Sequence, residues 1–195
     1  VGVKRACRLP EIHNRKIIMT TPKNFKHPQF GIFKWIPDWE AYMGRIPWGK
    51  RKITAIIYQD VLDHSGIESI WQTLVDIVSH AETWDAEIHT ALKKHFYTLA
   101  EDWFSPHDDY DETDFDHLIA DMAEHIGKKT AKRLVLSGKI DEDGFYRLMK
   151  LDSISLSEQD LLDFNFDDDG WIFDGHSITL TASIEQGILD GSIAG

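Results

Sequence analysis

The amino-acid sequence changes its hydrophobic period twice, and this constrains the fold more than any other feature. Residues 29–58 and 151–195 are short runs of aromatic and β-branched residues punctuated by Gly, Pro and Asp, which is typical of antiparallel strands joined by turns. Residues 66–103 instead repeat apolar side chains every three or four positions, which predicts amphipathic helices. We therefore predict an α+β fold, with a mostly antiparallel sheet from an N-terminal meander and C-terminal hairpins, packed against helices from the middle of the chain.

Local signals predict where several elements begin and end. Ser65, with a Glu three residues later, has the pattern of a capping box and predicts a helix start. Gly127 predicts the end of one helix, and Asp141 predicts the N-cap of a later, shorter one. After an acidic turn at 167–170, the run 171–182 predicts one long strand.

The length and composition predict one domain. A chain of 195 residues of which 42% are hydrophobic can bury a sizeable core. We expect residues 29–195 to form a single α+β domain and residues 1–28 to be a disordered or extended N-terminal segment.

The charge is uneven, and it bears on the kind of partner. The net charge is −12, but residues 1–52 carry 12 Lys/Arg and 3 Asp/Glu, whereas residues 53–195 carry 9 and 30. An acidic body repels phosphate backbones, so nucleic acid is not an expected partner. It attracts a basic protein and speeds the encounter, although acidity can also serve solubility alone.

Cysteine content and hydropathy predict a cytoplasmic location. Cys7 is the only cysteine, so no disulfide can form within the chain, as suits a reducing compartment. No apolar run approaches the roughly 20 residues of a membrane helix, and the first residues lack the apolar segment of a secretory signal. We expect no membrane association.

Two acidic segments and two tryptophans are the candidates for contacts with a partner. Asp-rich stretches can dock a basic surface, and aromatic residues that flank turns are frequent in interfaces. The predicted partner-binding residues are Asp108, Asp109, Asp111, Glu112, Asp167, Asp168, Asp169, Trp39 and Trp48.

A short motif around His176 has a structural and a catalytic interpretation. Structurally, Gly170, Phe173, Gly175 and His176 would form the closing hairpin, with the imidazole bonded to backbone. Catalytically, His176 would be a general base assisted by Asp174 or Asp169. Ser177 is adjacent and would point to the opposite face of a strand, so it does not supply a nucleophile, and we favour the structural interpretation.

Two patterns suit a metal ion, yet each has a simpler explanation. Residues 165–170 begin like a calcium loop, but the position that should hold a bidentate Glu is His176, and strands flank the segment. A second pattern places four possible ligands on one face of a helix, which is equally expected of a solvated polar face: Asp114, His117, Asp121 and His125. We predict neither a metal nor another cofactor.

Three stretches resemble a bacterial family known as domain of unknown function 2262: Trp84-Asp85, Phe145–Ser155 and Phe166–Gly195. The resemblance implies an N-terminal meander, a helical middle that contains the Trp-Asp pair, and a closing hairpin. Related domains often resemble immunity proteins, which bind and block a cognate bacterial toxin, so the resemblance implies a non-catalytic protein of that kind. A small hydrolase centred on His176 and a housekeeping adaptor are the alternatives.

Overall fold

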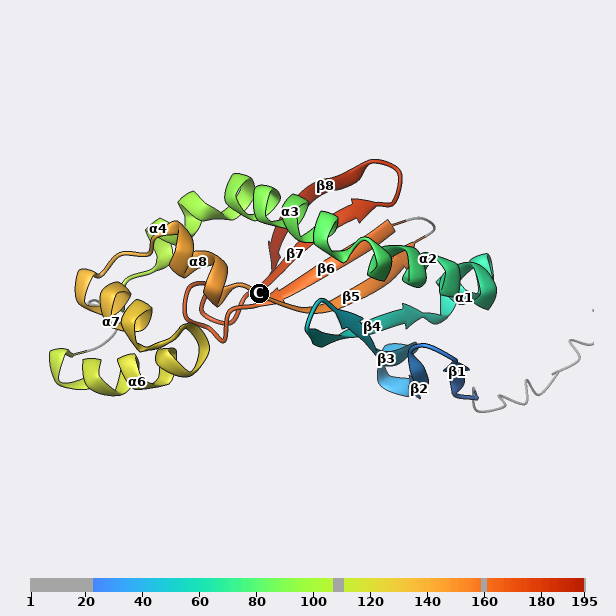
Figure 1. Cartoon of the computed structure of the whole chain (residues 1–195), viewed down its shortest axis with the longest axis horizontal. Coiled ribbons are helices and arrows are strands. Elements are labelled where there is room, and N and C mark those ends of the chain that lie inside the picture. The colour runs from blue at the N-terminus through green and yellow to red at the C-terminus, as the bar shows by residue number, and fades with distance from the viewer. Residues whose placement is uncertain (1–22, 107–110, 159–160, 195) are drawn as a thin grey trace, which may run out of the picture.

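A computed structural model describes residues 23–106, 111–158 and 161–194. These residues form one eight-stranded sheet whose spatial order follows the sequence (Figure 1). The strands are β1 (Phe25–His27), β2 (Gly31–Ile36), β3 (Ala41–Trp48), β4 (Arg51–Tyr58), β5 (Lys150–Glu158), β6 (Leu161–Asp167), β7 (Ser177–Ser183) and β8 (Gly187–Ala194).

The sheet confirms the predicted α+β class and adds one feature that the sequence did not reveal. Every pair of neighbouring strands is antiparallel except β4 and β5, which run parallel with Thr54 opposite Ser153. Strand β1 lies within the segment 1–28 that we expected to be disordered or extended, and residues 1–22 lie outside the described residues.

All the described helices of eight residues or more lie between β4 and β5 in the chain. They are α2 (Ile67–Ser79), α3 (Ala81–Leu92), α6 (Phe115–Ile126) and α7 (Lys128–Ser137). Shorter helical elements are η1 (Pro37–Trp39), α1 (Gln59–Ser65), the π-helix η2 (Lys93–Tyr97), α4 (Thr98–Trp103), η3 (Glu112–Asp114) and α8 (Glu142–Leu148).

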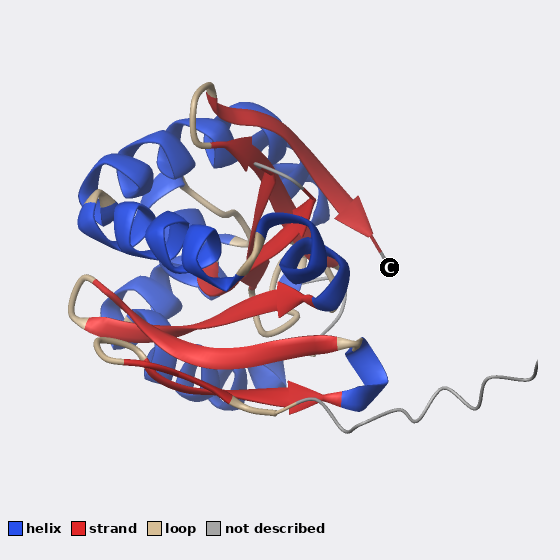
Figure 2. Cartoon of the chain, turned by 90° about the vertical axis from the view of Figure 1, so that its right-hand side faces the viewer, coloured by secondary structure: helices blue, strands red, loops and turns tan. Residues whose placement is uncertain are grey.

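The helices form two groups (Figures 1 and 2). Helices α2 and α3 lie across one face of the sheet. Helices α6, α7 and α8, here called the helical cluster, lie together beyond one end of it. The Trp-Asp pair of the sequence attaches α3 to the sheet: the Trp48 indole donates a hydrogen bond of 2.8 Å to Asp85, and the Trp84 ring lies 5.2 Å from that of Phe164.

The helix ends show which local signals were decisive. Asp141 caps α8 as predicted, since its side chain accepts a 2.9 Å hydrogen bond from the Gly144 N–H. Gly127, with a φ of 82°, separates α6 from α7. The predicted capping box is wrong, because Ser65 is the last residue of α1 and Gly66, with a φ of 74°, is the N-cap of α2.

Gly44 in β3 leaves room for a buried ring. A Cβ atom at Gly44 would lie 2.6 Å from the ring of Phe33, which is fully buried and packs against Trp71. We predict that Gly44→Ala lowers the free energy of unfolding by about 2 kcal/mol, because a fully buried ring has no space to move into. Urea denaturation measures the loss.

A double-mutant cycle with Phe33→Leu tests this cause. A smaller side chain at position 33 removes the overlap, so Gly44→Ala should cost much less in that background than in the wild type. Equal costs in the two backgrounds would show that the ring is not the reason.

Candidate functional site

Residues 168–176, here called the Asp-Gly loop, connect β6 to β7 through two tight turns. The Trp171 N–H donates to the Asp168 carbonyl at 3.1 Å, and the His176 N–H donates to the Phe173 carbonyl at 2.9 Å. The central pairs of the turns, Asp169-Gly170 and Asp174-Gly175, all have φ between 50° and 79°. Positive φ at both central residues is the pattern of a type I′ turn, for which Asp-Gly is a favoured pair.

This loop corrects the prediction of a strand over 171–182, since β7 begins only at Ser177. Trp171, Ile172 and Phe173 have the composition of a strand, but they lie between the two turns and the latter two are buried. The backbone N–H groups of Ile172 and Phe173 donate to a side chain instead of to a neighbouring strand.

The Asp168 carboxylate supplies those hydrogen bonds. It accepts from the backbone N–H groups of Gly170 at 3.0 Å, Ile172 at 2.7 Å and Phe173 at 2.8 Å. The residue is only 2% exposed, so it does not present its charge to a partner, contrary to its place among the predicted contacts. Asp168 instead holds the Asp-Gly loop together.

His176 closes the second turn with its side chain. Its Nδ1 lies 2.7 Å from the Phe173 carbonyl oxygen, and a carbonyl only accepts, so Nδ1 carries the proton and donates. Its ring is half-buried and meets the Trp103 ring edge-on, with 5.3 Å between the centroids. The imidazole is therefore held by backbone on one side and by an indole on the other.

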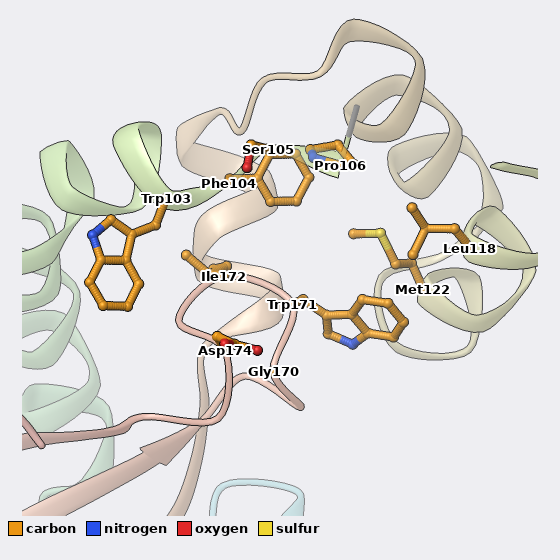
Figure 3. Close-up of a pocket in the computed structure, with 10 residues that line it drawn as sticks. All are labelled: Trp103, Phe104, Ser105, Pro106, Leu118, Met122, Gly170, Trp171, Ile172 and Asp174. Atoms are coloured by element: carbon orange, nitrogen blue, oxygen red, sulfur yellow. The ribbon is translucent and has the colours of Figure 1, made fainter. Parts of the chain in front are cut away.

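The Asp-Gly loop separates two hollows in the surface. The first, the helix-side cavity, has a volume of about 500 Å³ and lies between the loop, the end of α4 and helix α6 (Figure 3). The second, the sheet-side groove, has a volume of about 670 Å³. Trp39, Tyr58, Asp152, Asn165, Asp167 and His176 are among the residues that line this groove.

A polar row of the sheet forms the floor of the sheet-side groove. The Asn165 side chain donates to Ser155 at 2.8 Å and accepts from Thr179 at 3.1 Å. Asp152 occupies a β-bulge between Leu151 and Ser153, where β5 has one residue more than β6. Bulges redirect side chains, and Asp152 is exposed at the groove.

The predicted partner-binding residues occupy different environments. Trp39, 52% exposed, and Asp167 come together in the sheet-side groove although they are far apart in the chain. Trp48 is 2% exposed at the end of β3, so it belongs to the core and not to the predicted contacts. Asp111 is exposed in the connection before α6.

Three predicted residues have no described side-chain position. Asp108 and Asp109 lie outside the described residues, and of Glu112 only the backbone is described, in η3.

Asp169 faces away from His176 and toward the helical cluster. Its carboxylate forms an ion pair with Lys150 and lies 3.2 Å from His125 Nδ1. Asp174, the other assistant in the catalytic interpretation, makes no hydrogen bond or ion pair with a described residue. The described contacts thus give His176 a backbone partner and no carboxylate partner.

The match to a family model covers most of this architecture. Residues 27–193 match the model described as "Uncharacterized protein conserved in bacteria (DUF2262)". The chain belongs to this family. No curated protein and no solved structure matches the chain. The resemblance that we saw in three stretches is confirmed for the family, and the immunity role that it implied stays a prediction.

The possible metal ligands of this family member do not converge in the described part of the chain. Asp114, His117 and Asp121 line a small hollow of about 280 Å³ beside Trp171, while His125 contacts Lys150 and Asp169. Within the described ranges, no group of three or more His, Cys, Asp or Glu side chains is placed to hold a metal ion. No described helix is both long and apolar enough to cross a membrane.

Two site residues escaped the sequence analysis. Trp103 is the last residue of the segment 66–103 that was predicted to form amphipathic helices, and it is 38% exposed and lines the helix-side cavity. Asp152 stood in a run predicted to be a plain strand. A signal did exist, since Asp152, Ser153 and Ser155 are polar positions in an otherwise apolar strand.

Asp168 offers a direct test of the Asp-Gly loop. Asp168→Ala leaves three backbone N–H groups without their acceptor, two of them buried, so we predict a loss of about 3 kcal/mol in the free energy of unfolding. The matched control, Asp152→Ala, removes an exposed carboxylate and should change stability by only about 0.5 kcal/mol. Thermal and urea denaturation measure both, and similar values for the two variants would contradict the anchoring role.

Proposed function

We propose that the protein is an immunity protein, which binds a cognate bacterial polymorphic or contact-dependent toxin in the cytoplasm and neutralises it by covering it with an acidic surface. The single observation that carries this proposal is the sheet-side groove. Residues from five separate parts of the chain build it, and two of these residues, Trp39 and Asp167, were expected from the sequence to contact a partner. Action by binding, and not by catalysis, is part of the proposal.

The charge of the groove suits a basic partner. Asp152 and Asp167 are exposed at the groove, and no Lys or Arg is among the described residues that line it. An uncompensated negative groove on a chain of net charge −12 attracts a Lys- or Arg-rich surface over a distance and orients it on arrival. Complementary charge of this kind raises the association rate and discriminates between partners.

Trp39 supplies an apolar contact beside these charges. Its side chain is half exposed at the end of η1, where the following residue, Glu40, adopts a left-handed conformation with a φ of 46°. A tryptophan at the centre of an interface buries a large area at little conformational cost and is among the commonest energetic hot spots. The groove therefore combines an affinity anchor with charges that set specificity.

The partner-binding role of the groove predicts separable effects of two substitutions. Trp39→Ala should weaken binding about 30-fold, because the anchor is lost. Asp167→Asn should mainly slow association and reduce its dependence on salt, because one charge is lost. Surface plasmon resonance at low and moderate salt, with the toxin captured from the source cell by residues 19–195, measures both.

Matched controls lie on the helical cluster away from the groove. Leu136→Ala and Asp116→Asn also remove an exposed apolar and an exposed acidic side chain, and both should leave the affinity unchanged. If the groove variants bind the captured protein with the same affinity as the controls, the groove is not the contact surface. The captured protein should be more toxic to cells that contain the Trp39→Ala variant than to cells that contain the wild-type protein. Equal toxicity in the two would contradict the immunity role.

The acidic segment before α6 is the second predicted contact. Reversing its four charges to Lys should weaken binding and flatten the salt dependence, since these residues are expected to face basic side chains of the toxin: Asp108, Asp109, Asp111 and Glu112. A control with the same change in net charge reverses Asp102, Asp116, Glu124 and Glu185. Equal affinities of the two variants would show that only the overall charge matters.

A further inference from the structure

The helix-side cavity has walls of buried apolar side chains from three separate elements. Phe104 follows α4, Leu118 and Met122 belong to α6, and Ile172 comes from the Asp-Gly loop, and each of the four is at most 5% exposed. The volume of about 500 Å³ is within the range of sites for small molecules, roughly 300–1,000 Å³. None of the described lining residues is among the proposed toxin contacts.

Aromatic rings stand on different sides of the cavity (Figure 3). Trp103 and Trp171 lie on opposite sides of Ile172, and Phe104 lies on the side of Ser105 and Pro106. The Trp103 ring is held in place by edge-on contacts, 5.7 Å from Phe173 and 5.3 Å from His176 between centroids. The faces of such rings carry negative charge density and attract cations that have shed part of their water.

One unpaired carboxylate completes the lining. Asp174 sits in the second turn with a φ of 50°, a conformation that non-glycine residues seldom adopt, and it forms no hydrogen bond or ion pair with a described residue. No Lys, Arg or His is among the described residues that line the cavity. The nearby Lys150 is engaged by Asp169 and His125 instead. Among the residues that the structure describes, the negative charge of Asp174 thus has no counter-ion.

From this arrangement we propose that the helix-side cavity is a binding site for a small organic cation, an ammonium with an apolar body. The cationic head would face Asp174 and the Trp171 ring, and the apolar body would lie against Leu118, Met122 and Ile172. An anion of the same shape is repelled by Asp174, and a neutral analogue gains only the apolar contacts. The proposal does not depend on the immunity role.

Titration with three probes of similar shape tests the charge preference. Phenyltrimethylammonium is the cation, 2-phenyl-2-propanol is the neutral analogue and benzenesulfonate is the anion. In two-dimensional NMR spectra of the full chain, the cation should shift the indole N–H signal of Trp171 and leave that of Trp39 unchanged. We expect the cation to bind at least tenfold more tightly than either analogue.

Asp174→Asn locates the charge that is responsible. Asn tolerates the left-handed conformation, so the turn is retained, and affinity for the cation should fall about tenfold toward that of the neutral analogue. The control Asp167→Asn removes a carboxylate on the other side of the Asp-Gly loop and should leave cation binding unchanged. Equal binding of the three probes, or equal affinity of the Asp174→Asn variant and the wild type, would overturn the proposal.

Discussion

The parallel pairing of β4 with β5 determines the arrangement of everything else in this fold. Antiparallel neighbours need only a short turn between them, but parallel neighbours need a connection that leaves the sheet and returns to the same end. Here that connection is residues 59–149, and it contains every described α-helix. One long crossover therefore supplies both the helices that cover a face of the sheet and the cluster beyond its end.

The two hollows follow from this arrangement. Because α2 and α3 cover one face, the polar row of Asn165 and its neighbours lies on the other, where it forms the floor of the sheet-side groove. Because α6 lies beyond the end of the sheet, the connection from β6 to β7 has a helix to pack against, and the helix-side cavity is the space left between them. The Asp-Gly loop belongs to both hollows, and its shape rests on Asp168.

The sequence analysis succeeded where a signal is local. The α+β class, the cap at Asp141 and the break at Gly127 each depend on a few adjacent residues or on one clear period. It failed where the answer depends on distant parts of the chain. The parallel register of β4 and β5 leaves no local trace, and a strand and the Asp-Gly loop differ only in whether the backbone of 171–173 bonds a neighbouring strand or a carboxylate.

The acidic turn shows why composition alone could not assign the site residues. The Asp168 carboxylate accepts hydrogen bonds from backbone N–H groups, and the Asp169 carboxylate forms an ion pair with Lys150. Neither therefore offers a free charge. The Asp167 carboxylate accepts a 2.8 Å hydrogen bond from the Asp169 N–H, but neither Asp167 nor Asp174 forms an ion pair with a described residue. These two line hollows on opposite sides of the loop. Carboxylates of identical chemistry thus have different roles. Asp168 anchors the loop, Asp169 bridges to Lys150, and Asp167 and Asp174 are exposed in the two hollows. Because Asp167 and Asp174 line different hollows, the proposed binding of a protein at one and the proposed binding of a small cation at the other can be altered independently.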